Sequence, residues 1–307
     1  MRDEIGYQVE DLTSFSKALK YEARNRGYGA SKLVFTGSGD SYASSLFAHY
    51  FSGGLATVAD PYELQNYAEL SRNKTVYITS VTGRTRANIQ LARKISSVAK
   101  RRIAVTANPA SKLAQECDET IQLKYRTPGV LTAGTIGFTS SLIALASQIQ
   151  PLRLEGLDDA MRHAVHWAQP LKLGKTRRIV FVGSGTGYAI AAYGAFKIHE
   201  VLGLPADYQH AEQLGHSQLF SLSKSDMIVF LNVVDDEKTE TLYSALRRFG
   251  FEVFLFRIDT TDQIMSALEG SFAVQHLALG LARSRGQTEC AFLSDKKRLD
   301  LSGRLIY

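Results

Sequence analysis

Residues that could bind an anion cluster at two places in the first half of the chain. Residues 80–85 read Ser-Val-Thr-Gly-Arg-Thr, and residues 37–41 read Gly-Ser-Gly-Asp-Ser. Each segment follows a short apolar run and precedes a helical pattern, so the amides of a helix N-terminus would point toward it. Three hydroxyls around one glycine, on Ser80, Thr82 and Thr85, predict a binding site for a phosphate monoester.

The simplest alternative is helix capping, in which Thr82 or Thr85 bonds a free amide of the first turn. One cap accounts for one hydroxyl, and the segment has three. Ser38 and Ser41 in the neighbouring segment would add two more donors. The chain lacks the sequence G-x-x-x-x-G-K-[ST], so we do not expect the phosphate to belong to a nucleoside triphosphate.

A glycine turn after a strand is also typical of dinucleotide-binding folds. Asp60, at the end of the next apolar run, falls near the place of a ribose-binding acid. Tyr42 argues against this alternative, because it fills the third glycine position, where close packing of helix against strand needs a small residue.

Groups that could move protons lie in the second half of the chain. Lys197 and Glu200 are three residues apart, which places them on one face of a helix. His216 follows in a predicted loop that is rich in titratable residues. A carboxylate and an imidazole near a phosphate site suit an aldose–ketose rearrangement, in which one group opens the sugar ring and the other moves a proton between C1 and C2. An exposed salt bridge is the alternative for Lys197 and Glu200.

A third segment, residues 127–133, reads Thr-Pro-Gly-Val-Leu-Thr-Ala and joins a strand to an apolar helix. Its backbone and the hydroxyl of Thr132 could contact a sugar. By itself the segment is equally well interpreted as a connector.

The composition excludes several classes of protein. The chain has 307 residues, of which 45% are hydrophobic and 21% charged, so we expect about two packed domains. Its net charge of +6 is small for this length, so we expect no nucleic-acid partner. Polar residues interrupt the most apolar stretch, 134–149, so we expect a buried helix, no membrane association and a cytoplasmic protein. Cys117 and Cys290 have no metal-ligand spacing, so we expect neither structural zinc nor another metal.

An internal repeat indicates the architecture. Residues 32–43, KLVFTGSGDSYA, and 178–189, RIVFVGSGTGYA, share seven of twelve positions at an offset of 146. Each copy reads as a strand, a glycine turn and a helix, covering 42–51 in the first copy and 188–202 in the second.

Further apolar runs alternate with helical patterns in both halves, which predicts an α/β fold of two tandem flavodoxin-like subdomains, each a mainly parallel sheet covered by helices on both faces. We place the boundary near residue 170, giving domains 1–170 and 171–307. The other predicted strands cover 56–59, 75–79, 103–106, 120–123, 227–231 and 253–256, and the other predicted helices 5–25, 85–98, 134–149 and 239–248, with a connecting helix and linker over 151–176.

The chain resembles the double-SIS (sugar isomerase) domain family, and its duplication is similar to the isomerase half of glucosamine-6-phosphate synthase. Residues 37–42 match the first loop of that family. Residues 80–85 are similar to its Ser-x-Ser-Gly-x-Thr phosphate loop, and residues 129–132 to its Gly-Val-Ala-Ser segment.

The resemblance implies a role for each site residue and no cofactor. Ser80, Thr82 and Thr85 would hold the phosphate with help from Ser38 and Ser41, while Val130 and Thr132 would line the sugar site. Glu200 would shuttle the C1/C2 proton, Lys197 would stabilise charge beside it, and His216 would open the ring. In the family that histidine comes from the neighbouring subunit, which implies a homodimer with shared active sites.

Two departures narrow the implied activity. The glutaminase half of the synthase is absent and residue 2 is Arg, so we expect no glutamine-dependent amide transfer. The tail has Ser302 nearest the place of the family's Schiff-base lysine. The resemblance therefore implies an isomerase of a hexose or hexosamine 6-phosphate, of which an isomerising glucosamine-6-phosphate deaminase is one form. The alternative is a non-catalytic sensor or regulatory protein that binds a phosphosugar.

Overall fold

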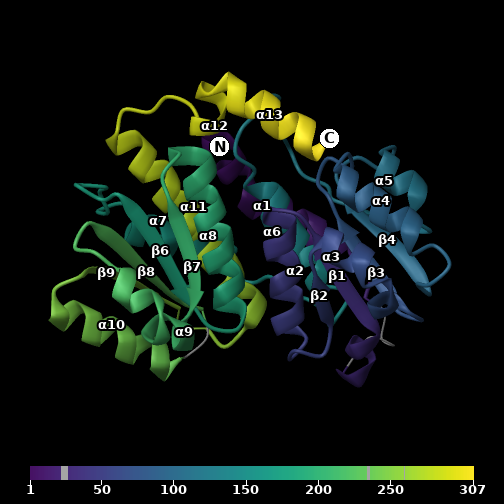
Figure 1. Ribbon diagram of the computed structural model, residues 1–307, viewed down its shortest axis with the longest axis horizontal. Coiled ribbons are helices and arrows are strands. Elements are labelled where there is room, and N and C mark those ends of the chain that lie inside the picture. The colour runs from purple at the N-terminus through teal and green to yellow at the C-terminus, as the bar shows by residue number, and fades with distance from the viewer. Residues whose placement is uncertain (22–26, 234–235, 259) are drawn as a thin grey trace. The chain divides into compact units, whose positions relative to one another are not determined.

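A computed structural model describes residues 1–21, 27–233, 236–258 and 260–307. It contains two compact units, each built on one sheet (Figure 1). The first-sheet unit comprises Gly6–Pro128, Gly134–Leu154 and Lys297–Tyr307, and the second-sheet unit comprises Met1–Ile5, Gly129–Ala133 and Glu155–Lys296. The division into domains 1–170 and 171–307 stays a prediction.

Five parallel strands in the order β2-β1-β3-β4-β5 form the first sheet. This order, with the first strand inside the sheet, is that of flavodoxin-like folds. The strands are β1 (Leu33–Gly37), β2 (Thr57–Ala59), β3 (Thr75–Thr79), β4 (Arg101–Thr106) and β5 (Glu119–Gln122), and the helices are α1 (Arg2–Ala18), α2 (Asp40–Phe51), α3 (Pro61–Asn66), α4 (Arg86–Lys94), α5 (Lys112–Glu116), α6 (Ile136–Ala146) and α13 (Lys296–Ile306).

Four parallel strands in the order β7-β6-β8-β9 form the second sheet, which repeats the first four positions of the first sheet. The predicted α/β class with two parallel-sheet subdomains is confirmed. The strands are β6 (Arg178–Gly183), β7 (Ala206–His210), β8 (Asp226–Asn232) and β9 (Glu252–Arg257), and the helices are α7 (Leu157–Ala168), α8 (Thr186–Leu202), α9 (Ala211–His216), α10 (Glu237–Phe249), α11 (Gln263–Ser284) and α12 (Ala291–Ser294).

Alternation along the buried strands explains why helices cover both faces of each sheet. In the first sheet, Val34 and Val76 join a cluster with side chains of α3, α4 and α5, whereas Phe35 and Tyr77 face the other way and stack at 5.2 Å. In the second sheet, Val180 joins a cluster with α9 and α10.

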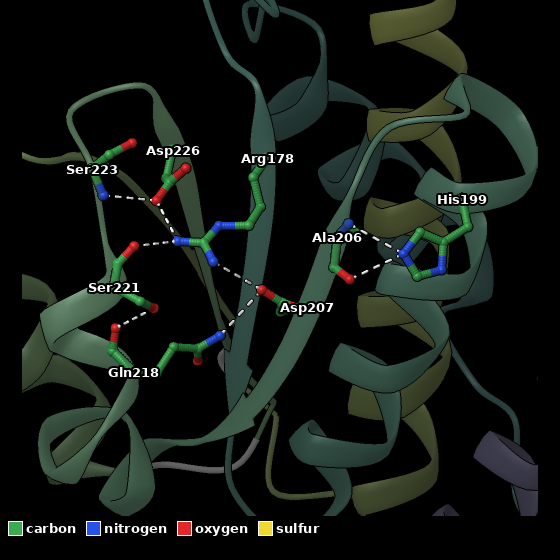
Figure 2. Close-up of polar contacts among 8 residues, drawn as sticks. All are labelled: Arg178, His199, Ala206, Asp207, Gln218, Ser221, Ser223 and Asp226. Carbon is green, nitrogen blue, oxygen red and sulfur yellow. Dashed lines mark hydrogen bonds and ion pairs between the residues drawn. The ribbon is translucent and has the colours of Figure 1, made fainter.

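The two units repeat a local brace as well as a fold. His49 Nδ1 lies 2.6 Å from the carbonyl oxygen of Ala56, and His199 Nε2 lies 3.0 Å from that of Ala206. Figure 2 shows the second brace beside a polar network in which Arg178 contacts Asp226 at the amino end of the second sheet. Each histidine ties the end of a helix to the beginning of the next strand.

The structure contains elements that were not predicted, among them the helices α3, α5, α9, α11, α12 and α13, and two predicted helices end earlier than expected. The strand β7 was not predicted, because the sequence Ala-Asp-Tyr-Gln-His has no apolar run and only Ala206 is buried. The first helix ends at Ala18 rather than continuing to residue 25, and the predicted residues 22–25 lie outside the described part of the chain. The helix predicted to end at residue 98 ends at Lys94, with turns after it.

No helix among the described residues combines the length and apolar character needed to span a bilayer.

Candidate functional site

The hydroxyl-rich segment 80–85 connects the carboxyl end of β3 to the N-terminus of α4. Ser80 is buried, and its Oγ lies 3.1 Å from Oγ1 of Thr85. Thr85 is the N-cap residue of α4, but its side chain makes no capping hydrogen bond to the first turn. The partly exposed Thr82 accepts a hydrogen bond from the amide of Arg84 (3.3 Å). The helix N-terminus therefore lacks a side-chain cap and carries no acidic residue, as an anion site requires.

Gly83 allows this loop to fold tightly. Its φ is 64°, a conformation that favours glycine. A Cβ added there would lie 2.1 Å from Oγ of Ser111, so a larger residue would clash with Ser111 unless the loop moved. Thr106 donates from Oγ1 to the carbonyl of Val81 (3.1 Å), and the amide of Leu113 donates to the carbonyl of Gly83 (3.1 Å). Residues of the next strand and helix thus support the loop from beneath.

Asn88 fastens α4 to the strand before it. Its side chain is buried, and Nδ2 donates to the carbonyl oxygen of Thr79, the last residue of β3, over 2.9 Å. Neither Asn88 nor Ser111 was predicted from the sequence as a residue of the site. A polar residue on the apolar face of the predicted helix was the available signal for Asn88, whereas no local signal identifies Ser111.

The segment 37–41 lies beside this loop, because Gly37 pairs with Thr79 in the register of β1 and β3. A Cβ on Gly37 would lie 2.6 Å from Cβ of Ser41, so the turn into α2 requires a glycine. Ser41 is buried and Ser38 is exposed. The structure therefore brings Ser38, Ser41 and the loop 80–85 to neighbouring positions at the carboxyl ends of β1 and β3.

Basic side chains accompany the loop. The exposed Arg84 places its guanidinium 5.3 Å from the ring centre of Tyr307, and Arg86 Nη2 lies 3.5 Å from the carbonyl oxygen of Arg304. The helix α13 therefore packs beside the loop within the first-sheet unit. Ser302, on this helix, is exposed.

Asp60 does not occupy the role of a ribose-binding acid. Its Oδ1 accepts hydrogen bonds from the amides of Tyr62 (2.7 Å) and Glu63 (3.3 Å) and so caps α3. The carboxylate is engaged in holding a helix end, which agrees with the argument from Tyr42 against a dinucleotide.

Lys197 and Glu200 form an ion pair on α8 in the second-sheet unit. The side chain of Lys197 is 0% exposed and that of Glu200 is 39% exposed. A fully buried ammonium needs compensation for its lost hydration, and the carboxylate supplies part of it. The pair thus has a buried cation and an accessible carboxylate, unlike the exposed salt bridge considered from sequence.

His216 is the last residue of α9, a short helix where sequence analysis expected a loop. Its side chain is 69% exposed, and Nε2 lies 3.0 Å from Oε1 of Glu212. The ion pair with Lys238, and secondarily the contact with His216, lowers the pKa of Glu212. Within the described chain, His216 is therefore paired with its own helix rather than with Lys197 or Glu200.

Val130 and Thr132 belong to the short segment of the second-sheet unit, 129–133. Val130 is 68% exposed. Oγ1 of Thr132 accepts a hydrogen bond from the N-terminal amine (2.6 Å) and lies 3.9 Å from Sγ of Cys290. The roles of all these predicted site residues, including these two, stay predictions.

Solved structures with a similar fold cover almost the whole chain. A glucosamine-6-phosphate deaminase from Thermotoga maritima is 18% identical with a TM-score of 0.73, over 93% of this chain and 94% of that one. A tagatose-6-phosphate ketose/aldose isomerase from Escherichia coli is 16% identical with a TM-score of 0.67, over 94% and 92%. Because sequence identities of 18% and 16% are low, the structural similarity shows a shared fold and nothing further.

Sequence relatives are longer enzymes. Glutamine–fructose-6-phosphate aminotransferase (isomerizing) of Escherichia coli strain K12 is 27% identical over 250 residues, 71% of this chain and 40% of the relative. The protein of the same name from Sulfurisphaera tokodaii is 24% identical over 260 residues, 80% of this chain and 43% of the relative. The chain therefore spans less than half the length of these curated relatives. The SIS domain matches residues 28–149 and 172–248, more than half of the chain, which therefore belongs to the SIS domain family.

Proposed function

We propose that this protein is an aldose–ketose isomerase of a hexose or hexosamine 6-phosphate. The observation that carries the proposal is the uncapped N-terminus of α4, where Ser80 and Thr85 approach each other at 3.1 Å and no acid lies in the first turn. Amides and hydroxyls there suit a phosphate dianion. The names of the isomerase and deaminase of similar fold support the choice of a sugar phosphate.

In the proposed mechanism, Glu200 moves the proton between C1 and C2 of the open-chain sugar. Its partly exposed carboxylate can reach a substrate, whereas the buried Lys197 holds the carboxylate and offsets negative charge as it develops. His216 promotes ring opening by transferring a proton to or from the ring oxygen. The proton removed from one carbon returns to the other, so the reaction needs no oxidant or reductant.

The test compares Glu200→Gln with Glu252→Gln, which makes the same change at an exposed carboxylate of β9. We expect Glu200→Gln to lower kcat by about 10²-fold or more, as removal of a general base does, with unchanged binding of the sugar phosphate. The control should retain wild-type kcat. Wild-type turnover by Glu200→Gln would reject the assignment.

Substrate and direction are tested by incubating the protein with fructose 6-phosphate, with and without ammonia, and with glucosamine 6-phosphate. Interconversion of fructose and glucose 6-phosphates supports the isomerase. Release of ammonia from glucosamine 6-phosphate would identify the deaminating form. Thermal stabilisation by a sugar phosphate without any product would instead favour the sensor.

We also propose that the active protein is a homodimer in which His216 serves the partner's site. Mixing the inactive variants Glu200→Gln and His216→Ala under exchange conditions should then restore about a quarter of wild-type activity, since half of the dimers would carry one intact site. No recovery, with mixed dimers confirmed by mass, would show that each subunit supplies its own histidine.

A further inference from the structure

A buried contact chain leads from α11 to the carboxylate of Glu200 inside the second-sheet unit. Gln275 on α11 is fully buried, and its Nε2 donates to Oη of Tyr193 over 3.1 Å. Tyr193 is also fully buried, and its ring centre lies 5.3 Å from Nζ of Lys197. Lys197 in turn pairs with Glu200. This series of contacts thus begins in the core, at Gln275, and ends at the partly exposed carboxylate of Glu200.

We propose that Tyr193 and Gln275 are positioning residues for the acid–base pair, an inference that rests on the proposed function. Tyr193, Lys197 and Glu200 follow one another at intervals of four and three residues, so they share one face of α8. The ring offers its negative face to the ammonium, and the glutamine bond prevents the ring from turning away.

Burial explains why the position of Lys197 needs such support. An ammonium without water must find all its stabilisation in the protein, and a half-exposed carboxylate supplies only part of it. An aromatic face stabilises a desolvated cation further without competing for the proton that Glu200 must exchange. An acidic residue in place of Tyr193 would lack this advantage, because its carboxylate would be a second ion-pair partner for Lys197.

The first-sheet unit provides a matched control. Tyr77 is fully buried, and its hydroxyl lies 3.2 Å from Oε1 of the buried Gln148. Tyr77→Phe therefore also removes a buried tyrosine–glutamine hydrogen bond, here one that the tyrosine donates, in a unit that contains neither Lys197 nor Glu200.

The experiment measures kcat and KM for the sugar phosphate in Tyr193→Phe, Gln275→Met, their double variant and Tyr77→Phe. We expect each of the first two to lower kcat by about 3- to 10-fold with KM within about twofold, as expected when a positioning hydrogen bond is lost but the phosphate contacts remain. The double variant should be no slower than the worse single variant, because both remove one bond. The control should keep kcat even where it lowers the melting temperature.

A stronger change tests the ring itself. Tyr193→Leu should lower kcat by at least about 10-fold, which corresponds to loss of a desolvated cation–π contact. Tyr193→Trp, which restores an aromatic face, should recover part of this loss. If the folded variants Tyr193→Phe, Gln275→Met and Tyr193→Leu all keep wild-type kcat while Glu200→Gln is inactive, the positioning role is wrong and the proposed function stands.

A second measurement does not depend on turnover. Limited acetylation with acetic anhydride, mapped by mass spectrometry, should label Lys197 far less than exposed lysines in the wild type. Labelling of Lys197 should rise several-fold in Tyr193→Phe and Gln275→Met but not in Tyr77→Phe. Unchanged labelling would overturn the inference even if the protein proved to have no isomerase activity.

Discussion

The two units differ at two equivalent helix N-termini, those of α4 and α10. In the first-sheet unit, the loop after β3 leads to α4, whose N-cap Thr85 makes no side-chain cap and whose first turn has no acid. In the second-sheet unit, the loop after β8 leads to α10, whose N-cap Asp236 accepts from the amides of Lys238 (2.9 Å) and Thr239 (3.3 Å). One helix N-terminus is available to an anion, and the other is occupied by a carboxylate of the chain itself.

The carboxylate of Asp236 is well suited to remain there. Burial alone would raise the pKa of Asp236, but hydrogen bonds from Ser184 and Thr239 outweigh it and hold the pKa below the usual value. Two further acids, Glu237 and Glu240, lie in the first turn of α10. A duplicated fold therefore need not duplicate a helix N-terminus that suits an anion, because an acid at that position disfavours a phosphate.

The largest effect should come from making the first loop resemble the second. In Thr85→Asp, we expect a carboxylate at the N-terminus of α4 to weaken binding of fructose 6-phosphate by about 10²-fold or more, because like charges about 4 Å apart repel by several kcal/mol near a protein surface. Titration calorimetry measures the affinity. Gln90→Asp adds the same charge on an exposed turn of α4 and should change the affinity little. Equal losses in both variants would contradict an anion site at the N-terminus of α4.

A smaller effect is expected on thermal stability, where replacing the two N-cap residues, Asp236 and Thr85, should have different consequences. Asp236→Ala removes a side chain that caps two amides and should destabilise its unit by about 1 kcal/mol, whereas Thr85→Ala removes no cap. Differential scanning calorimetry should show a lower unfolding midpoint for Asp236→Ala and a smaller change for Thr85→Ala. The order should reverse for affinity, which only Thr85→Ala should weaken. Equal midpoint shifts would contradict the assignment of the caps.

The smallest effect concerns the caps of the short helices α3 and α9. Asp60 caps α3, whereas His210 at the N-cap of α9 makes no capping bond and stacks on Tyr188 with ring centres 3.5 Å apart. Burial lowers the pKa of His210 below 6.5. The unfolded chain therefore binds this proton first, so the stability from neutral His210 is present above about pH 6.5 and is lost as pH falls through the folded-state pKa.

Thermal unfolding between pH 7.5 and pH 5, in roughly half-unit steps, can test this sign. His210→Gln should show a weaker decrease in midpoint on acidification than the wild type. His276, whose pKa is lowered by burial and by Arg283, contributes in the same direction and should maintain part of the decrease. A steeper acid decrease in His210→Gln would contradict the proposed sign.

Sequence patterns predicted the buried central strands well because their signals are local, whereas the largely buried helix α11 was not predicted. The run Thr75–Thr79 is a strand at its predicted bounds, since uninterrupted β-branched and aromatic residues fit a sheet covered on both faces. The edge strand Ala206–His210 escaped prediction because half-buried positions carry polar residues without penalty. Because this strand was not predicted, the short helix that follows it, α9, which ends at His216, was not predicted either.

The repeated strand–turn–helix units and the chemistry of each loop can be predicted from local sequence, because glycine conformations, apolar periodicity and hydroxyl chemistry depend on neighbours in the chain. Tertiary packing determines that the N-terminus of α4 lacks a side-chain cap, that Asp236 caps that of α10, and that the buried ammonium of Lys197 lies over the ring of Tyr193. Burial and hydrogen bonding are settled by residues distant in the chain, such as Gln275, and no local pattern records those partners.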